Sequence, residues 1–488
     1  MDYEMLLATF RRQIGPQAYA RMPRQNRLYA SLRAAILSGK IEEGTRLLSS
    51  RLMSEELGMA RNSVLYAYER LASEGFVRGT RQGTVVARVG LTQTPAAAPA
   101  EMPALSRRVT HLNRPGKGMD DPLPFLPGTP ALDEFPLAQW RRCIERAWRS
   151  TGSAQLGYAP TSSNAALRRV IAEYLRVSRG VRCDAEQVFV THGTQSGLGL
   201  CAHALADAGD TVWVENPGYN GARNAFLAAD LRLTPIPVDA DGLAPQPRHW
   251  RDTPPKLIYI TPSHQYPLGA VMSLERRLAL VAQARTAGAW IIEDDYDSEF
   301  RRQGAPLSAL QGLAEDAPVI YLGTFSKVMF PALRIGFMVV PPALTPVLRR
   351  AAGALMLRGR AADQQALADF IEAGHFTRHL ARMRRLYVQR RDALQDALER
   401  HLRDLLTVSG AGGGMHLSAR LDVPAADTEV SRAGRERALV LRPLSQLCLP
   451  ESEETYNGLM LGYGAVPAET MDAAARTMKQ AIHAALRT

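Results

Sequence analysis

A lysine, a carboxylate and a phenol stand near the ends of apolar strands in this sequence. Lys327 comes shortly after the apolar run 319–322, where a loop can present its amine. Asp294 follows the apolar run 290–292, and Tyr296 lies two residues further on. Binding crevices in open parallel sheets lie at the carboxyl ends of the strands. An amine held there can form an imine with a carbonyl compound, which is the chemistry that these groups predict.

A second set of residues is suited to an anion and to a flat ring. Gly193, Thr194 and Gln195 stand at a strand-to-helix junction, where free backbone N–H groups and the helix dipole favour a phosphate. Arg334 offers a bidentate cation to the same phosphate. Tyr219 can cover a ring with its own ring. Taken singly, these are as readily surface or core residues as ligands, so their coincidence carries the prediction.

Pyridoxal 5′-phosphate makes four demands on a protein, and each has a candidate here. The cofactor needs a lysine for the imine, a carboxylate that keeps its pyridine nitrogen protonated, an aromatic ring over its face, and donors around its phosphate. Lys327, Asp294 and Tyr219 meet the first three demands, and the Gly-Thr-Gln junction with the arginine meets the last. Tyr296 can donate to the phenolic oxygen. We therefore expect pyridoxal 5′-phosphate as a Schiff base on Lys327.

Strands alternate with helix-length segments over most of the chain after residue 119. The strand candidates are Val188–Val190, Thr211–Val214, Leu257–Ile260, Trp290–Ile292, Val319–Leu322 and Ile335–Val340, and Leu274–Ala287 is one of the helix-length segments. Short buried strands alternating with helices predict an α/β fold with a mainly parallel sheet. From Pro346 onward the sequence is helix-rich, with Arg358–Arg403 as the longest stretch, and a smaller α+β subdomain is expected at the end.

The first 90 residues carry a different pattern. An apolar residue every four positions from Leu28 predicts one helix, Ser49 caps a second, and a third begins near Arg61. Alternating residues over 75–86, interrupted by glycines, predict a two-stranded hairpin. Three short helices and a hairpin make a winged helix-turn-helix, a fold that lays one helix in the major groove of DNA.

Polar and basic side chains gather where such a fold meets DNA. Arg61, Asn62 and Ser63 open the third helix, Arg51 opens the second, and Gly83 lets the hairpin backbone approach a groove. This region holds 14 Lys and Arg against 8 Asp and Glu, a net of +6 out of +11 for the whole chain. Such an excess favours a polyanionic partner. For any single arginine, an ordinary solvated surface is the alternative.

Residues 91–118 separate the two regions. Four prolines and an alanine run without periodicity predict an extended linker, so the expected domains are 1–90, 91–118 and 119–488. The four cysteines form no CxxC pair and have no metal-ligand spacing, so no metal is expected. No apolar run reaches the roughly 20 residues of a membrane helix, and the N-terminus lacks a secretory cleavage site, so a cytoplasmic protein is expected.

The run GTRLLSSRLMSEELGMARNSVLYAYERLASEGFVRGTRQGTVV, residues 44–86, resembles the GntR-type winged-helix head along its whole length. The family's Ser-Ser-Arg, its Arg-Asn at the start of the recognition helix and its wing glycine all have matches here. Two positions depart from the family. Leu48 stands where proline is usual, and Ala60 stands where a serine usually caps the recognition helix. Losing such a cap costs about 0.5–2 kcal/mol, which the fold is expected to survive.

The later region resembles fold-type I aminotransferases, and in particular the MocR subfamily of GntR-type regulators, over residues 120–488. The matching motifs are THGTQSGL, VWVENPGYNGAR, TPSHQYPLG, IIEDDYDSEF and GTFSKVMFPALRIGF. The resemblance implies the same roles for the lysine, the carboxylate and the two tyrosines named above. It adds Ser326 to Thr194 and Arg334 as phosphate contacts.

Two departures from the aminotransferases concern the site. His264, Gln265 and Tyr266 occupy the stretch where those enzymes place an asparagine near the phenolic oxygen of the cofactor. Near the C-terminus, Gly458 stands where we expect the arginine that grips the α-carboxylate of a substrate. The missing arginine weakens the case for transamination, and Arg223 is then a candidate anion contact for an effector.

Three functions follow from this pattern. The favoured one is a DNA-binding regulator in which the cofactor, or a small amine, changes the body and so controls operator binding. The others are an aminotransferase with an appended DNA-binding module and a DNA-binding protein whose body is a relic. The family resemblance also implies a homodimer, and a dimer with two heads predicts repeated half-sites in the operator.

Overall fold

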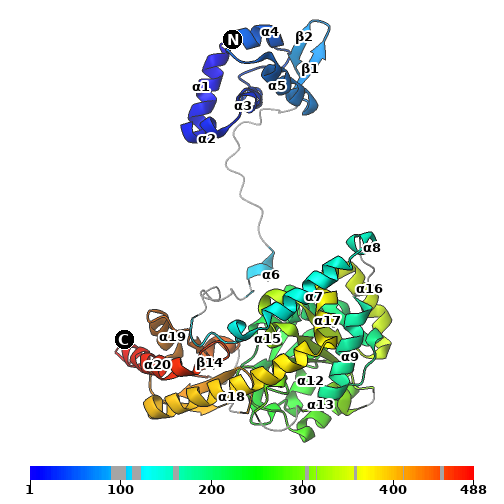
Figure 1. Cartoon of the computed structure of the whole chain (residues 1–488), viewed down its shortest axis with the longest axis vertical. Coiled ribbons are helices and arrows are strands. Elements are labelled where there is room, and N and C mark those ends of the chain that lie inside the picture. Colours follow the sequence, from blue (N-terminus) through cyan, green and yellow to red (C-terminus); the bar gives the residue numbers. More distant parts are fainter. Residues whose placement is uncertain are drawn as a thin grey trace. The chain divides into compact units, whose positions relative to one another are not determined.

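The computed structural model describes residues 1–88, 106–110, 112, 123–157, 164–302, 307–314, 316–356, 360–409, 412–450 and 456–487. They belong to two compact units, Met1–Ala104 and Leu105–Thr488, here called the head and the body (Figure 1). Most of the expected linker, 91–118, lies outside the described residues, and its described part contains the short helix α6 (Arg107–Thr110). The expected domain boundaries stay predictions.

The head contains the expected three helices and hairpin. They are α3 (Arg24–Leu37), α4 (Ser50–Glu56), α5 (Arg61–Ser73), β1 (Val77–Thr80) and β2 (Gly83–Val86). Ser49 caps α4 by accepting from the backbone N–H of Leu52 at 3.3 Å. Leu28, Val64 and Leu71 lie in the buried core between the helices. This arrangement confirms the winged helix-turn-helix.

Two helices precede the expected ones. They are α1 (Tyr3–Ile14) and α2 (Pro16–Arg21). The carboxylate of Asp2 accepts from the backbone N–H of Met5 at 2.8 Å and so caps α1. Tyr3 is buried in the head core. The N-terminal extension is therefore a packed part of the head, which the sequence pattern did not predict.

The body is built on an eight-stranded sheet in the order β3-β10-β9-β8-β7-β4-β5-β6. The strands are β3 (Val188–Thr191), β4 (Thr211–Asn216), β5 (Arg232–Asp239), β6 (Gly242–Leu243), β7 (Leu257–Ile260), β8 (Trp290–Asp295), β9 (Val319–Thr324) and β10 (Gly336–Val339). The pairs from β5 through β4, β7 and β8 to β9 are parallel. β10 pairs antiparallel with both β9 and β3, and β6 pairs antiparallel with β5. The expected mainly parallel sheet is confirmed.

Helices pack on this sheet and on each other. They are α7 (Leu137–Arg149), α8 (Ser153–Leu156), α9 (Ala165–Arg179), α10 (Thr194–Leu205), α11 (Asn220–Ala228), α12 (Pro247–Asp252), α13 (Leu274–Ala287), α14 (Leu310–Leu313), α15 (Phe325–Val328), α16 (Thr345–Leu355), α17 (Ala361–Glu372) and α18 (His375–Leu402). α17 lies against α7 and α9 (Figure 1). The bounds of α13 agree with the expected segment. The long stretch expected over 358–403 is divided, because Gly374 adopts a left-handed conformation between α17 and α18.

The C-terminal part is the expected α+β subdomain. A four-stranded antiparallel sheet has the order β11-β12-β14-β13, from β11 (Leu406–Ser409), β12 (His416–Leu421), β13 (Arg442–Pro443) and β14 (Gly458–Gly462). α19 (Asp427–Arg435) and α20 (Met471–Ala485) pack against one another. Among the described residues, no helix is long and apolar enough to cross a membrane.

Candidate cofactor and DNA-binding sites

Lys327 lies on α15, directly after strand β9. Thr324 caps this helix by accepting from the backbone N–H of Ser326 at 3.1 Å, which fixes the turn that carries the lysine. The Lys327 amine is half-buried and donates to the carbonyl oxygen of Gly128 at 2.7 Å. Burial lowers the pKa of Lys327, while the nearby charges of Asp297 and Asp294 oppose that shift. A lysine held in this way has a larger neutral fraction than a surface lysine, as imine formation requires.

Gly128 is a site residue that the sequence did not reveal. Its φ of +76° is in the left-handed region. A Cβ at this position would come within 2.5 Å of the Lys327 amine nitrogen. Glycine is therefore required where the chain passes over the lysine. In the sequence, Gly128 is marked only by the run Pro127-Gly128-Thr129, and such runs are common in loops.

Asp294 lies one residue before the end of strand β8, with one oxygen paired and the other without a partner among the described residues. The Tyr259 hydroxyl, on the adjacent strand β7, donates to Oδ2 at 2.7 Å. Oδ1 is buried and has no hydrogen-bond partner among the described residues. Burial raises the pKa of Asp294 to about 7, against the Tyr259 hydrogen bond, which lowers it. A buried carboxylate oxygen without a partner is costly unless a ligand supplies the donor.

The neighbouring acids on β8 are already engaged elsewhere. Glu293 accepts from the backbone N–H groups of Leu310 and Gln311. Asp295 is paired with the Arg179 guanidinium at 2.7 Å in a buried salt bridge. The pleat of a strand sends successive side chains to opposite faces, so these two acids point away from Asp294. Of the three, only Asp294 has a buried oxygen without a hydrogen-bond partner among the described residues.

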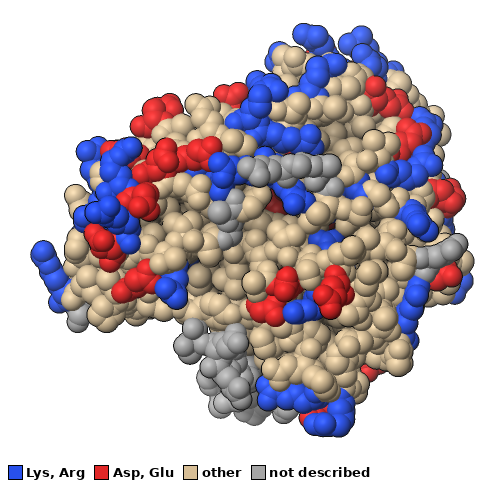
Figure 2. Space-filling view, turned by 90° about the horizontal axis from the view of Figure 1, so that it is seen from below, with Lys and Arg blue, Asp and Glu red and all other residues tan. Residues whose placement is uncertain are grey.

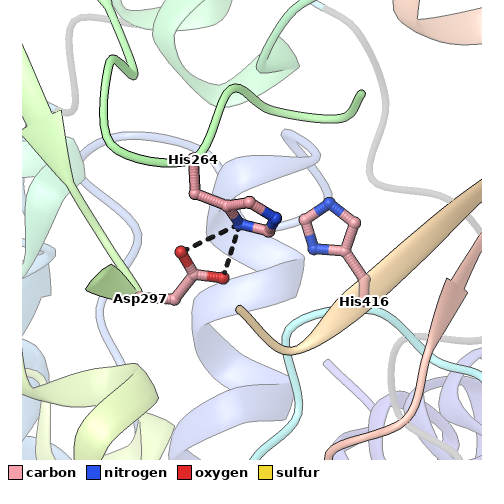
Figure 3. Close-up of side chains that lie close together, drawn as sticks. All are labelled: His264, Asp297 and His416. Carbon is pink, nitrogen blue, oxygen red and sulfur yellow. Dashed lines mark hydrogen bonds and ion pairs between the residues drawn. The ribbon is translucent and has the colours of Figure 1, made fainter. Parts of the chain in front are cut away.

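Tyr296 and His264 form a buried group with Asp297 and His416. The Tyr296 hydroxyl donates to the His264 carbonyl oxygen at 2.9 Å and lies 3.1 Å from His264 Nδ1. His264 Nδ1 also lies 3.1 Å from both carboxylate oxygens of Asp297 (Figure 3). The ring of His416, from β12, lies 4.9 Å from that of His264, centroid to centroid. The cluster thus joins loops of the large sheet to the C-terminal subdomain.

Gln265 and Tyr266, the other residues in place of the asparagine, have different roles. Gln265 is buried, and its amide donates to the Pro217 carbonyl oxygen at 3.0 Å. The Tyr266 ring packs edge-on against Tyr219 and against Tyr296. Gln265 therefore holds the loop, and Tyr266 forms part of an aromatic wall beside Tyr219.

Tyr219 lies at the start of α11, half-buried, with its hydroxyl 3.4 Å from the Gln195 side-chain amide, which donates to it. Burial raises the pKa of Tyr219 to about 12, while the positive charge of Arg442 acts in the opposite direction. Gln195 comes from α10 at the junction expected to hold a phosphate. The structure thus brings the expected stacking ring and the expected phosphate corner together.

The phosphate corner consists of backbone and small residues with one arginine. Gly193, with φ of +94°, caps α10 and is followed by Thr194. A Cβ on Gly193 would lie 3.9 Å from Cζ of Arg334, so the exposed Arg334 side chain approaches the helix start. Ser326 lies one residue before the lysine on α15. These are the features of an anion site: free N–H groups at a helix start and a nearby cation.

Arg442 is an arginine near the aromatic wall that the sequence did not single out. A Cβ on Gly458 would come within 2.5 Å of the Ala419 carbonyl oxygen, because β14 packs tightly there. The neighbouring strand β13 instead supplies Arg442, whose charge acts on both Tyr219 and Tyr266. An arginine therefore does lie beside the aromatic wall. Its sequence signal, an arginine between apolar residues and a proline, was missed because β13 has only two residues.

Arg223, the expected effector contact, is buried on α11. Its guanidinium donates to the carbonyl oxygen of Glu215 and to the side-chain oxygens of Asn216 and Asn220, at 3.2–3.3 Å. To bind an effector, Arg223 would have to give up these contacts, which brace the loop that carries Tyr219. The expectation remains a prediction, and the geometry favours a structural role.

The residues of the body fit pyridoxal 5′-phosphate on three independent observations. Asp294 has an unpartnered buried oxygen, as a protonated pyridine nitrogen requires. The amine of Lys327 has a lowered pKa and a close glycine above it. The phosphate corner combines a helix start with Arg334. When bound, this cofactor supplies an aldehyde that reacts with amines and a ring that withdraws electrons.

The head presents its polar residues on one exposed surface. Arg61 and Asn62 are exposed at the start of α5, whereas Ser63 is half-buried. The Arg61 guanidinium donates to Ser50 Oγ at 3.3 Å, and Arg51 pairs with Glu55 at 3.2 Å. No side chain caps α5 at Ala60, as the departure from the family predicts. The start of the recognition helix is thus free to face DNA.

Arg46, beside the hairpin, is a further basic residue that the sequence did not single out. Gly83 has φ of +124°, and a Cβ there would lie 3.1 Å from the Arg46 guanidinium. The backbone of Arg46 forms an isolated antiparallel β-bridge with Val85 of β2. Its guanidinium lies beside Gly83 of the hairpin. The face of the molecule in Figure 2, by contrast, mixes basic and acidic side chains around a largely uncharged middle. Such a mixture lacks the uniformly positive field that attracts nucleic acids.

Comparison with known families divides the chain at the same place. Residues 128–455 match the class I and II aminotransferases, and residues 24–86 match the bacterial regulatory proteins of the gntR family. The chain is 39% identical to a probable rhizopine catabolism regulatory protein, MocR, of Rhizobium meliloti, over 95% of this chain and 94% of that protein. It is 33% identical to the pyridoxine biosynthesis transcriptional regulator PdxR of Corynebacterium glutamicum, over 96% of this chain and 97% of that protein.

Aminotransferases resemble the body alone. The 2-aminoadipate transaminase of Thermus thermophilus is 33% identical over 60% of this chain and 73% of the enzyme. Among solved structures, the α-aminoadipate aminotransferase LysN of Thermus thermophilus, complexed with N-(5′-phosphopyridoxyl)-L-leucine, aligns with a TM-score of 0.71 and 27% identity. That alignment covers 78% of this chain and 98% of the enzyme. The full-length relatives are regulators, and the enzymes share the body only.

Proposed function

This chain is a MocR-type transcriptional regulator of the GntR family with an aminotransferase-like body, and from that premise we propose that pyridoxal 5′-phosphate, or a small amine that reacts with it, controls its binding to operator DNA. Lys327 forms the Schiff base, Asp294 pairs with the pyridine nitrogen, and Tyr296 donates to the phenolic oxygen. Tyr219 covers the ring. The single observation that carries the proposal is the unpartnered Oδ1 of Asp294, whose other oxygen accepts from Tyr259, in a site that also holds a half-buried lysine.

The phosphate is bound at the helix start of α10. The backbone N–H groups of Thr194 and Gln195 and the hydroxyl of Ser326 donate to its oxygens, and Gly193 keeps the approach open. Arg334 supplies the countercharge. The left-handed Gly193 and the nearby Arg334 side chain support this assignment.

The head binds DNA with the start of its recognition helix and with its wing. Arg61, Asn62 and Ser63 contact base edges, Arg51 contacts a phosphate or a base edge, and Gly83 lets the wing approach a groove. The exposed positions of Arg51, Arg61 and Gly83 support these roles. Specificity then comes from the base contacts, and affinity comes largely from the phosphate contacts.

The chain acts as a homodimer on repeated half-sites. A dimer carries two heads, so a single site would leave one head without DNA. The domains of this proposal are the head over 1–90, a linker over 91–118 and the body over 119–488. An extended linker would let the heads bind direct or inverted repeats.

Turnover as an aminotransferase is a second candidate function, and Arg442 is the observation that favours it. The positive charge of Arg442 acts on Tyr219 and Tyr266, and such a charge near the site would attract the carboxylate that every α-amino acid carries. A regulator that senses an amino acid needs the same contact. The full-length regulators among the relatives favour sensing over turnover.

The test uses the purified full chain with added pyridoxal 5′-phosphate. We expect a visible absorption band that borohydride fixes covalently to Lys327, located by peptide mass mapping. Selection of bound DNA from a random pool should yield repeated half-sites, and adding the cofactor or small amines should change DNA affinity. A chain that selects DNA but neither takes up the cofactor nor responds to it would contradict the proposed control. Sustained conversion of amino-acid and keto-acid pairs would favour the enzyme.

A further inference from the structure

We infer that His264, held by Asp297, is the positioning residue for Tyr296 and so sets the protonation of the cofactor in place of the missing asparagine. The inference rests on the proposed binding of pyridoxal 5′-phosphate. His264 is 5% exposed and Asp297 is 1% exposed, so their contact is shielded from water. A buried hydrogen-bonded pair held in this way imposes its geometry on any group that touches it.

The hydrogens of this cluster can be assigned from its contacts. A carboxylate accepts only, so His264 Nδ1 carries the hydrogen between His264 and Asp297. The same N–H is 3.1 Å from the Tyr296 oxygen. The Tyr296 hydroxyl donates to the His264 carbonyl oxygen at 2.9 Å. His264 Nε2 is left as a buried acceptor with no partner among the described residues.

One phenol hydrogen cannot serve two acceptors equally. If Tyr296 donates to the cofactor's phenolic oxygen, its hydroxyl must turn away from the His264 carbonyl oxygen. The Nδ1 hydrogen of His264 can then be shared between the Asp297 carboxylate and the Tyr296 oxygen, because Nδ1 lies 3.1 Å from each of them. Tyr296 keeps an acceptor contact on the histidine side and presents its hydrogen to the cofactor.

The surroundings hold the histidine in place. A Cβ on Gly414 would come within 2.2 Å of His264 Cε1 and 2.6 Å of an Asp297 oxygen. The His416 ring lies nearby, tilted by 43° from the His264 ring, with Nε2 3.0 Å from the Pro267 carbonyl oxygen. Both come from the C-terminal subdomain. A movement of that subdomain would therefore change how His264 holds Tyr296, which links the cofactor to the part of the body most remote in sequence from the head.

Apart from the residue that each variant changes, the titratable groups around Tyr296 are the same in every variant used below. Asp297, Tyr266, Glu215 and Asp294 act on Tyr296 itself, and Lys327, His416 and Tyr463 act on or are acted on by the groups of this cluster. Burial raises the pKa of Tyr296 above its ordinary value, and the negative charge of Asp297 adds to that rise. The phenol therefore keeps its hydrogen over the working pH range and acts as a donor.

The experiment measures the pH midpoint of the cofactor's visible band in the loaded full chain. A phenol that donates to the phenolic oxygen favours its anionic form, so losing the donor raises the midpoint. Tyr296→Phe should raise it by about one unit, the shift expected from a hydrogen bond to a charged group. His264→Leu, similar in volume but without nitrogen, should raise it by less. His264→Gln, which retains a donor, should raise the midpoint less than His264→Leu does. Asp297→Asn should also raise the midpoint, by only part of the Tyr296→Phe shift.

A double variant separates positioning from a general structural effect. Because His264 acts through Tyr296, Tyr296→Phe combined with His264→Leu should match Tyr296→Phe alone. The matched control is His401→Gln, which breaks another His–Asp pair, His401 with Asp472, at 2.8 Å on α18. That change should leave the midpoint in place.

The outcomes that would overturn the inference are distinct from a failure of cofactor binding. A loaded His264→Leu chain with the wild-type midpoint would refute it, and so would additive shifts in the double variant. A midpoint that moves on adding a chelator or zinc would mean that the cluster binds a metal instead. If His264→Leu does not load, Asp297→Asn and His264→Gln decide the question. A wild-type chain without a borohydride-fixed band would refute the proposed function itself.

Discussion

The two candidate sites differ in how deeply their side chains lie in the protein. In the head, the Arg51 side chain is 80% exposed, and its contact with Glu55 is a surface ion pair. In the body, Asp294 and Asp297 are almost completely buried and are held by Tyr259 and His264. The head presents ready-made chemistry to a large, rigid partner. The body encloses its chemistry, as a small molecule with one reactive group requires.

This difference decides how each site tolerates change. An exposed arginine can be replaced with little effect on the fold, because surface ion pairs contribute about 0–1 kcal/mol. A buried carboxylate cannot lose its partner without leaving an unsatisfied group, which costs about 1–3 kcal/mol or more. Changes in the head should therefore affect binding alone, and changes in the body should affect binding and stability together.

The largest expected effect is in Lys327→Ala. The variant has no amine for the Schiff base, so covalent capture of the cofactor by borohydride should be lost completely, while the head still binds DNA. Lys479→Ala, on the exposed face of α20, is the matched control that removes a lysine elsewhere in the body. Mass spectrometry after reduction checks both. An adduct that persists in Lys327→Ala would place the Schiff base on another lysine.

Asp294→Asn comes next. The amide keeps the size of the side chain but removes the charge that pairs with a protonated pyridine nitrogen. A hydrogen bond to a charged group contributes about 1.5–3 kcal/mol, so the dissociation constant of the cofactor should rise by roughly 10-fold to 100-fold. Equilibrium titration of the visible band measures the change.

Tyr259→Phe tests whether Asp294 is positioned or merely present. The variant removes the donor to one oxygen and leaves the charge, so the loss of affinity should be about 10-fold or less. Equal losses in the two variants would mean that orientation matters as much as charge. No loss in Asp294→Asn would assign the pyridine contact to another group.

In the head, Arg61→Ala should weaken specific DNA binding without affecting the cofactor. A base contact contributes about 1–3 kcal/mol, while a phosphate contact mainly lowers the salt dependence. Arg403→Ala, a body residue with an exposed side chain, removes the same charge and serves as the control. Mobility shifts at two salt concentrations separate the two kinds of contact. If both variants bind like the wild type, the recognition helix does not read DNA through Arg61.

The sequence predicted the two folds well because their patterns are local. Ser49 as a cap, the bounds of α13 and the strands of the large sheet follow from residues close together in the chain. The chemistry of Lys327 was predicted because a whole set of groups coincided. The helix α1 was missed because its cap, Asp2, is at the very start of the chain and its apolar residues are few.

The site details could not be predicted because they depend on which strands are neighbours. Nothing in the run Glu293-Asp294-Asp295 tells which carboxylate keeps a free oxygen; the partners of the other two come from α9 and α14, more than ten residues away. Gly128 and Arg442 enter the site from opposite ends of the body's sequence. Arg223 looked like an anion contact until its own loop was seen to use its guanidinium.

The smallest expected effect concerns the stability of the unloaded body. Burial raises the pKa of Glu215, Glu293, Asp294 and Glu299 to about 7 each, whereas an unfolded carboxyl has a pKa of about 4. A group whose pKa is raised by folding stabilises the native state fully below its unfolded pKa, and this contribution is lost as the pH rises through 7. The unloaded chain should therefore unfold at a higher temperature at pH 6.5 than at pH 8. Below pH 6.5 the buried His416, whose pKa is lowered, opposes the trend.

Asp294→Asn makes this prediction specific to the site. From pH 8 to pH 6.5, each such carboxyl contributes somewhat less than about 1 kcal/mol, so the variant should lose about one quarter of the pH dependence, a change of roughly 1–2 °C. Bound cofactor should remove the same share, because its pyridine nitrogen then pairs with the ionised carboxylate. Thermal unfolding of the wild type and the variant, each with and without cofactor, measures all four slopes. If the unloaded variant has the wild-type slope, Asp294 is ionised without its ligand, and its buried oxygen must be satisfied in some other way. The contrast between a head that is complete by itself and a body with an unsatisfied group for its ligand would then fail.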